Sequence, residues 1–245
     1  MLTNRNVLIP MAGLGSRFSQ AGYNKPKPLI DIFGKTMIER AIESLGIDGN
    51  YIFVIRKDEN AKKLKSVLFR VKPDCRVIEI TGSTEGSACT CLIAKDLINN
   101  KSPLVIANCD QIMEWEPKNF FHSIKKLKPA GSVVTYNSNT KKNSYVKINS
   151  QGYALQFAEK KVISNHSLNG VHYWAQGSDF VASAEAMIRS NDRTNNEFYI
   201  APSYNYLVAM NKKIIIHEIS PEKHLPVGTP EDLLRFKKRR VDQLG

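Results

Sequence analysis

Short apolar runs alternate with amphipathic segments along the first half of the chain. The apolar runs have the length of buried strands, and apolar residues between them recur at the three- and four-residue spacing of helices. Such alternation predicts a mostly parallel sheet that helices cover on both faces. The predicted strands span residues 6–11, 51–55, 76–80 and 104–107. The predicted helices span residues 37–45, which Thr36 caps, 58–70 and 87–98.

Beyond Trp115 the pattern loosens, and β-rich segments with antiparallel pairing are expected. The fold class is therefore α/β: a three-layer α/β/α, Rossmann-like arrangement around a mixed, mostly parallel sheet. The predicted later strands span residues 133–136, 145–148, 153–157, 171–174 and 213–218. The predicted later helices span residues 179–189, 197–210 with an interruption near Pro202, and 230–244 after the cap Thr229.

Composition adds limits to this pattern. The chain has 245 residues, 42% of them hydrophobic and 24% charged, which excludes a disordered chain and allows a large core. No apolar run approaches the roughly 20 residues of a membrane span, and residues 1–18 predict a first strand rather than a signal peptide. The four cysteines have no metal-binding spacing, so we expect reduced thiols and a cytoplasmic location.

The formal net charge of +12 favours anionic partners, although an ordinary solvated basic surface would give the same value. Lysines are scattered, and the one dense basic run, at 237–240, has no nucleic-acid-binding motif beside it. We therefore expect no nucleic acid partner. Among anionic partners, we therefore expect phosphorylated small molecules.

A glycine-rich turn directly follows the first predicted strand, within a long predicted loop at 12–34. Gly13 and Gly15 expose backbone N–H groups that are able to cradle phosphates. A dinucleotide-binding loop is excluded because Phe18 stands at its third glycine position and no helix pattern follows. A Walker A loop is excluded because the segment lacks its closing Gly-Lys-Ser/Thr.

Two cations accompany this turn. Arg17 follows the glycines, and Lys27 stands between two prolines that stiffen the backbone around it. A guanidinium contacts phosphate oxygens in pairs and an ammonium acts as a point charge. The combination predicts a polyphosphate-binding loop.

The motifs G-x-G-x-R-F at 13–18, K-P-K-P-L-I at 25–30 and G-K-x-M-I-E at 34–39 give the chain a family resemblance. It resembles the sugar-phosphate nucleotidyltransferases, or NDP-sugar pyrophosphorylases, which have a glycosyltransferase-A-like fold. Weaker motifs of that family follow in order over nearly the whole chain, at 108–111, 159–160, 170–173, 196–199 and 228–232.

The resemblance implies attack of an acceptor phosphate on the α-phosphorus of an NTP, with pyrophosphate leaving. Arg17, Lys27 and Asp110 would be the catalytic residues: Arg17 for the β- and γ-phosphates, Lys27 for the α-phosphate, and Asp110 for Mg²⁺. One domain over 1–245 is expected, with a nucleotide-binding half at about 1–115 and an acceptor-binding half at about 116–245 that ends in a C-terminal helix. The implied acceptor-binding residues are Glu159, Lys160, Gly170 and Glu197.

Nucleotide contacts are expected at two segments, the glycine turn and a small-residue turn that opens a helix. Because backbone groups are expected to contact the base, the sequence does not decide which of CTP, UTP, GTP and dTTP is the substrate. A homo-oligomer is also possible. Many relatives carry a second metal-binding Asp where this chain has Pro226, so a two-carboxylate site is not expected; His224 is either a substitute ligand or a structural residue. The predicted nucleotide-contacting residues are Ala12, Gly13, Gly15, Ser16, Thr84, Gly86 and Ser87.

Three functions follow as alternatives. The first is an NTP-dependent transferase that acts on a sugar 1-phosphate, for surface polysaccharide or capsule precursors. The second is a CTP-dependent cytidylyltransferase that acts on a non-sugar phosphate such as phosphocholine or a phospho-alditol, and the third is a non-catalytic nucleotide-binding regulatory module. A glycosyltransferase would need a D-x-D motif, and residues 108–110 hold one carboxylate. A choline group would need an aromatic cage, for which the candidates are Tyr145, Tyr153, Tyr173, Trp174, Phe198 and Tyr199.

Overall fold

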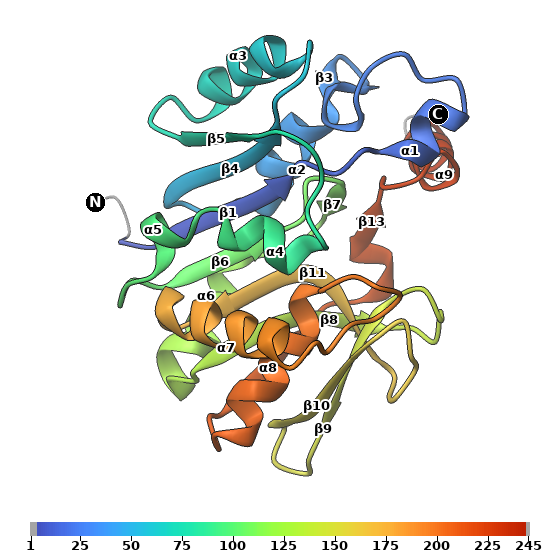
Figure 1. The fold of residues 1–245 in the computed structure, drawn as a ribbon. Helices are drawn as coiled ribbons and strands as arrows, with labels where there is room; N and C mark the ends of the chain where they lie inside the picture. Colours follow the sequence, from blue (N-terminus) through green and yellow to red (C-terminus); the bar gives the residue numbers. More distant parts are fainter. Residues whose placement is uncertain (1–3, 244–245) are drawn as a thin grey trace.

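A mixed nine-stranded sheet forms the centre of the molecule in a computed structural model that describes residues 4–243 (Figure 1). Its main path runs β10-β9-β11-β6-β1-β4-β5, and β8 pairs with both β11 and β12. The parallel pairs join β6, β1, β4 and β5, while β8 to β11 pair antiparallel, as the sequence predicts. The strands are β1 (Asn6–Met11), β4 (Asn50–Arg56), β5 (Arg76–Ile80), β6 (Leu104–Ala107), β8 (Gly131–Asn137), β9 (Ser144–Ile148), β10 (Ala154–Glu159), β11 (His166–Trp174) and β12 (Ile214–Glu218).

Helices cover both faces of this sheet, which confirms the predicted three-layer α/β/α fold. Alternate residues of β4 explain why: Phe53 and Ile55 belong to one core cluster, and Ile52 and Val54 to the other. A strand buried on both faces has the continuous apolar sequence seen here. The first cluster packs under α2 (Met37–Leu45), α3 (Ala61–Val71) and α6 (Pro117–Leu127). The second packs under α4 (Ser87–Leu92), α5 (Lys95–Ile98), α7 (Gly177–Arg189) and α8 (Ile200–Ala209).

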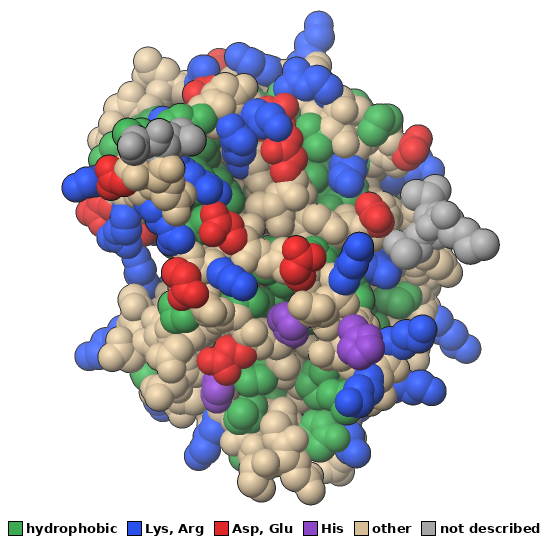
Figure 2. All heavy atoms as spheres, turned by 180° about the vertical axis from the view of Figure 1, so that it is seen from behind, with side chains coloured by type: hydrophobic (Ala, Val, Ile, Leu, Met, Phe, Trp, Pro, Cys, Tyr) green, Lys and Arg blue, Asp and Glu red, His purple; other side chains and the backbone are tan. Residues whose placement is uncertain are grey.

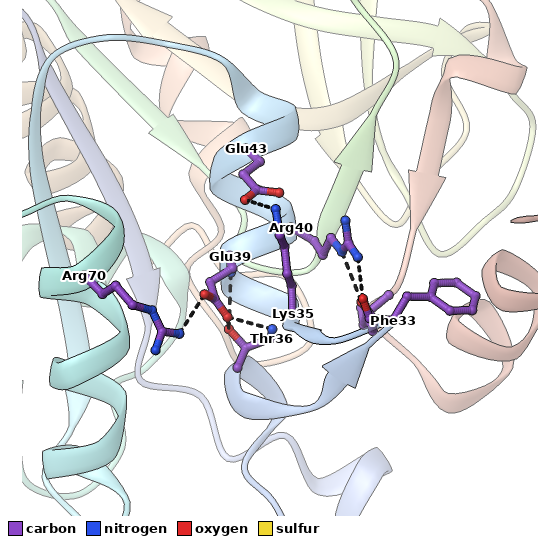
Figure 3. A network of polar contacts seen from close by, with 8 residues as sticks. Phe33, Lys35, Thr36, Glu39, Arg40, Glu43 and Arg70 are labelled. Atoms are coloured by element: carbon purple, nitrogen blue, oxygen red, sulfur yellow. Dashed lines mark hydrogen bonds and ion pairs between the residues drawn. The ribbon is translucent and has the colours of Figure 1, made fainter.

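The start of α2 forms as the sequence predicts. The backbone N–H of Glu39 donates to the Thr36 hydroxyl, and the Glu39 carboxylate accepts from the Thr36 backbone N–H at 2.8 Å. Arg70 of α3 reaches the same carboxylate at 2.7 Å (Figure 3). This reciprocal capping box fixes the helix start and ties α2 to α3.

Three local predictions are wrong. The predicted loop at 12–34 contains α1 (Ser16–Gln20), a 3₁₀ turn η1 (Lys27–Leu29) and the first strand of a hairpin, β2 (Asp31–Ile32) with β3 (Lys35–Thr36). The helix predicted at 87–98 is two helices, because Ala94 leaves helical geometry at φ −89° and ψ 13°. Pro202 does not interrupt α8, since it lies in the first turn, where its missing N–H has no helical acceptor.

A small two-stranded sheet, which the sequence did not predict, brings the end of the chain to the end of β6. Here β7 (Gln111–Met113) pairs antiparallel with β13 (His224–Pro226), which follows a short 3₁₀ turn η2 (Pro221–Lys223). The last helix, α9 (Pro230–Asp242), begins at the predicted cap Thr229, whose hydroxyl accepts from the Asp232 N–H. Residue 244 of the predicted helix lies outside the described residues.

Figure 2 shows one face of the molecule, on which Lys and Arg side chains are scattered and acidic side chains lie among many of them. Among residues 4–243, no helix combines the length and the apolar character that a membrane crossing requires.

Candidate active site

Lys27 and Asp110 form an ion pair beyond the carboxyl end of β6. The Lys27 ammonium lies 2.5 Å from Oδ2 of Asp110, and the two side chains are 19% and 23% exposed. Burial opposes the charged form of each group, but the opposite charge outweighs it, so the pKa of Lys27 is raised and the pKa of Asp110 is lowered. Two of the predicted catalytic residues are therefore in contact, and both are charged.

Glycines allow the backbone to approach this ion pair closely. Gly15, at φ 64°, caps α1, and a Cβ added there would lie 3.2 Å from Cβ of Lys27. A Cβ added at Gly228 would lie 2.5 Å from Oδ2 of Asp110. The neighbouring Val227 N–H donates to the backbone carbonyl of Asp110 at 2.9 Å. The glycine-rich turn and the segment before α9 thus enclose the pair from two sides.

Arg17 places a third charge in the same region. It is exposed on α1, which begins directly after the glycine turn. Burial raises and Lys27 lowers the pKa of Asp110, and Arg17 lowers it further. The three predicted catalytic residues are therefore within electrostatic range of one another, as a single polyphosphate ligand would require.

Three of the four predicted acceptor residues, Glu159, Lys160 and Glu197, interact with Tyr199 or with one another. The Lys160 ammonium donates to the Tyr199 hydroxyl and lies 4.4 Å from the centre of its ring. The Glu159 carboxylate accepts from the Ser144 hydroxyl. Burial raises the pKa of Glu159, and the negative charge of Glu197 raises it further. The hydrogen bond from Ser144 and the charge of Lys160 oppose this shift. Glu159, Lys160 and Glu197 thus share one polar cluster.

Arg17 also acts on this second cluster. Burial raises the pKa of Tyr199, a hydrogen bond to Glu197 and its charge raise it further, and the charge of Arg17 opposes them. The phosphate-loop guanidinium is therefore within electrostatic range of the acceptor-side residues. The charge of Arg17 thus acts on titratable groups of both clusters.

The predicted base-contacting turn packs directly against this cluster. Gly86 has φ 127°, and a Cβ there would lie 2.4 Å from the carbonyl oxygen of Phe198. The Ala88 N–H donates to the same carbonyl at 3.0 Å, and the Thr84 hydroxyl bonds the Gly86 carbonyl at 3.1 Å. Ser87 is the first residue of α4. Thr84, Gly86 and Ser87 are thus held against the segment that carries Tyr199.

The remaining predicted residues lie at the same edge of the sheet. The Ala12 carbonyl accepts from Nη2 of Arg56 at 2.9 Å. Gly13 is exposed, and an added Cβ there would have no atom within 4 Å. Ser16 is exposed at the start of α1. This part of the turn is open to a ligand.

Gly170 lies beside the residues that lead to Asp110. It falls in an irregular stretch of β11, and an added Cβ would lie 2.2 Å from Nδ2 of Asn108 and 3.0 Å from Oε1 of Gln111. Only glycine fits there, so Gly170 supports the end of β6 by close packing. Gly170 therefore affects the site indirectly, through its packing against Asn108 and Gln111.

The residues around Asp110 provide one carboxylate for a metal. Pro226 pairs with Gln111 across the small sheet and has no donor to offer. His224 stacks on Tyr136 with ring centroids 4.1 Å apart, and burial lowers its pKa to about 4. Within residues 4–243, no group of three or more His, Cys, Asp and Glu side chains is placed to hold a metal ion. This donor set fits a cation held by one carboxylate and by ligand oxygens, and it does not fit an all-protein cage.

The aromatic cage considered for a choline group does not form. Tyr145, Tyr173, Trp174 and Phe198 are buried in the core. Tyr199 has Lys160 over its ring, and Tyr153 has Lys213 over its ring at 5.0 Å. One cation of the chain therefore already contacts each of the two rings that are not buried.

The sequence analysis assigned no contact to two residues that have direct contacts in this site. Tyr199 was considered as a cage candidate and as part of the weak motif at 196–199, but its contact with Lys160, which joins segments far apart in the chain, was not predicted. Arg56 has no motif around it. Its one signal was its place directly after an apolar strand, where open α/β sheets bind ligands.

Comparison with known proteins identifies a matching family model and similar folds. A family model described as nucleotidyl transferase matches residues 7–238. The fold is similar to that of a nucleoside-diphosphate-sugar pyrophosphorylase from Vibrio cholerae RC9, with a TM-score of 0.83 and 22% identity over 95% of this chain and 99% of the other. It is also similar to a UDP-glucose pyrophosphorylase solved with UDP-glucose, with a TM-score of 0.76 and 18% identity over 99% and 100% of the two chains.

A curated relative matches part of the sequence. The bifunctional protein GlmU of Methanocaldococcus jannaschii is 29% identical over 117 residues. The match covers 47% of this chain and 27% of that relative. It supports the family likeness over that stretch alone.

Proposed function

Since the chain belongs to the nucleotidyl transferase family, and is a nucleotidyltransferase, we propose that it joins the NMP of an NTP to a sugar 1-phosphate. Pyrophosphate is the second product. An oxygen of the acceptor phosphate forms a bond to the α-phosphorus, and the bond from that phosphorus to the bridging oxygen of the β-phosphate breaks. The product is an NDP-sugar of the kind used for surface polysaccharide, made in the cytoplasm, where NTPs are available.

The observation that carries this proposal is the grouping of Arg17, Lys27 and Asp110. Transfer of this kind depends on positioning and on neutralising phosphate charge rather than on covalent chemistry. Arg17 binds the β- and γ-phosphates and stabilises the leaving pyrophosphate. Lys27, aimed by η1, moves from Asp110 to the α-phosphate.

Lys160 and Glu159 provide the acceptor side of the proposed site. The Lys160 ammonium is held by the Tyr199 hydroxyl and binds the attacking phosphate. The Glu159 carboxylate accepts hydrogen bonds from acceptor hydroxyls, in the way that it accepts one from Ser144. A sugar presents several such hydroxyls. Since the candidate cage residues are buried or covered by lysines, a sugar phosphate fits this side better than phosphocholine.

Asp110 is the residue that would hold Mg²⁺. A single carboxylate is enough because Mg²⁺ commonly takes one or two carboxylates together with substrate phosphates and water. When bound, the ion would neutralise phosphate charge as the bond to the leaving group breaks. Pro226 leaves no second carboxylate in β13 for this purpose.

The test is pyrophosphate release by the purified protein with Mg²⁺. Each NTP is paired with a panel of sugar 1-phosphates, with phosphocholine and with phospho-alditols, and products are identified by mass spectrometry. We expect at least one pairing of an NTP with a sugar 1-phosphate to release pyrophosphate and form the NDP-sugar. Turnover with non-sugar phosphates alone would support the cytidylyltransferase alternative. Nucleotide binding without turnover on the full panel would support the regulatory module.

A further inference from the structure

Arg56 lies between the two segments that we propose to contact the base. It is the last residue of β4, which lies between β1 and β5 in the sheet. Register places Arg56 opposite Ile80, the last residue of β5, and its neighbour Ile55 opposite Met11, the last residue of β1. The glycine turn follows β1, and the turn at 84–87 follows β5. Arg56 therefore lies at the strand end between the two turns.

The side chain of Arg56 extends over the face of the sheet that α4 covers. Ile52 and Val54, which alternate with it along β4, belong to the core cluster that includes Ala12 and Cys91 of α4. Nη2 of Arg56 donates to the Ala12 carbonyl at 2.9 Å. This contact places the guanidinium beneath the glycine turn.

The hydrogen-bonding capacity of this guanidinium is only partly used. Arg56 is half-buried and, within residues 4–243, takes part in no ion pair. Its Nε is buried without an acceptor, and the bond from Nη2 to Ala12 is its one hydrogen bond among those residues. A guanidinium carries five N–H donors, so Nη1 and the second Nη2 hydrogen remain for a ligand. An uncompensated, half-buried cation is costly unless a partner binds it.

On the proposed nucleotide site, we infer that Arg56 donates hydrogen bonds to a carbonyl oxygen of the nucleobase and so determines base specificity. Cytosine, uracil, thymine and guanine each present a ring carbonyl oxygen, and adenine presents none. A site built to donate to that oxygen discriminates against a base that lacks it, because the buried donor is left unpaired. The chain therefore selects CTP, UTP, dTTP or GTP over ATP.

Nucleotide binding measured by calorimetry tests this assignment without requiring turnover. We expect the wild-type chain to bind at least one of CTP, UTP, dTTP and GTP about tenfold or more tightly than ATP, as one charge-assisted hydrogen bond would give. In Arg56→Met this preference falls to about one, through loss of affinity for the preferred NTP with the affinity for ATP unchanged. Lys57→Met removes an exposed cation from the adjacent position and serves as the control, with the preference retained.

Arg56→Lys separates charge from hydrogen-bond geometry, since it keeps the cation but loses the planar fork. We expect Arg56→Lys still to bind NTPs through their triphosphate group, but to lose most of the preference for the favoured NTP over ATP. Equal weakening of all NTPs in Arg56→Met, with a lower melting temperature, would mean that Arg56 only supports the glycine turn and would overturn the assignment. So would an unchanged preference. If the wild-type chain binds no NTP at all, the proposed function fails together with the role of Arg56.

Discussion

At the scale of single residues, the Lys27–Asp110 ion pair has the largest consequences. The pKa of Asp110 lies below its ordinary 3.8 and the pKa of Lys27 above its ordinary 10.5, in both cases because opposite charge outweighs burial. The ion pair therefore stabilises the folded protein until the pH falls through the lowered pKa of Asp110 or rises through the raised pKa of Lys27. Over the neutral range both groups remain charged, and a triphosphate meets a preformed cation.

Removing either charge is expected to slow turnover severely. In Lys27→Met the charge on the α-phosphate is no longer neutralised, and in Asp110→Asn the proposed Mg²⁺ ligand is lost. Each variant should lower kcat by about 100- to 1000-fold, as loss of one positioned charge does elsewhere. Steady-state pyrophosphate release measures the effect, and circular dichroism shows whether the fold is retained.

Lys65→Met is the matched control for Lys27→Met. Lys65 also forms an ion pair, with Glu79, but it belongs to α3 and has no contact with the proposed site residues. Its kcat should stay within about twofold of the wild-type value, since partly exposed ion pairs contribute little. A normal kcat in folded Lys27→Met or Asp110→Asn would remove that residue from the mechanism.

Gly228 is also expected to be sensitive to substitution, because it packs against Asp110. A methyl group in Gly228→Ala would lie 2.5 Å from Oδ2 of Asp110, so the carboxylate must move. We expect kcat to fall at least about tenfold, a barrier increase of about 1.4 kcal/mol. Wild-type kcat in this variant, with an unchanged pH profile, would show that the carboxylate tolerates the displacement.

At the residue scale, the sequence predicted which residues lie near one another where chemistry and local motif coincide. Arg17 and Lys27 stand beside glycines and prolines that leave few other interpretations, and the structure brings both near Asp110. Arg56 carries no such local signal, and the weak motif at 196–199 does not indicate the partner of Tyr199. Their contacts are made with residues distant in the chain, which only folding brings together.

At the scale of elements, the start of α2 shows how local chemistry determines structure. Thr36 and Glu39 satisfy each other's backbone N–H groups, so this helix start needs no tertiary contact to be specified (Figure 3). Burial opposes the charge of Glu39, but the hydrogen bonds from Thr36, followed by Arg70, lower its pKa. The cap is therefore expected to remain intact at neutral pH and to weaken as the pH falls through this lowered value.

Thr36→Ala should lower the free energy of unfolding by about 1 kcal/mol, the usual cost of losing a capping hydroxyl. Urea denaturation followed by circular dichroism measures the change. Thr36→Ser keeps the hydroxyl and is expected to retain most of the stability. Equal losses in the two variants would mean that the methyl group, not the cap, is responsible.

The elements that the sequence predicted poorly are those whose pairing is non-local. The pair β7 and β13 has three residues on each side, and neither strand has a periodic pattern of its own. The break at Ala94 separates α4 from α5 within a continuous amphipathic pattern. In both cases packing against other elements, rather than local propensity, decides the backbone conformation.

At the scale of the whole molecule, one sheet unites the two halves of the chain. The antiparallel pair of β6 and β11 is the junction between them. Two histidines of the second half have lowered pKa values: His172 of β11 is buried, and His224 of β13 is half-buried. Burial lowers the pKa of His172 from an ordinary 6.5 to about 3. Burial also lowers the pKa of His224 from 6.5 to about 4, although the charges of Asp232 and Asp110 oppose this shift. Both are therefore neutral in the folded protein at neutral pH.

This arrangement predicts acid sensitivity of the fold. Below about pH 6.5 the unfolded chain binds a proton at each histidine that the folded chain does not bind, so stability falls as pH falls. Each histidine contributes a slope of about 1.4 kcal/mol per pH unit between its unfolded and folded pKa values. Urea denaturation between about pH 7 and pH 5 measures the slope, and His172→Phe should reduce it by one histidine's share. An identical slope in that variant would contradict the assignment.

The sequence by itself determined the main strands of the large sheet, the caps at Thr36 and Thr229 and the place of the glycine–proline loop, because apolar periodicity, capping residues and glycine–proline spacing act over a few neighbouring residues. Tertiary structure decided which groups share the site. The β7–β13 pair brings Gly228 against Asp110, the turn at Gly86 meets Phe198, and Arg56 reaches Ala12. These contacts depend on sheet order and on packing between distant segments, which no local pattern encodes.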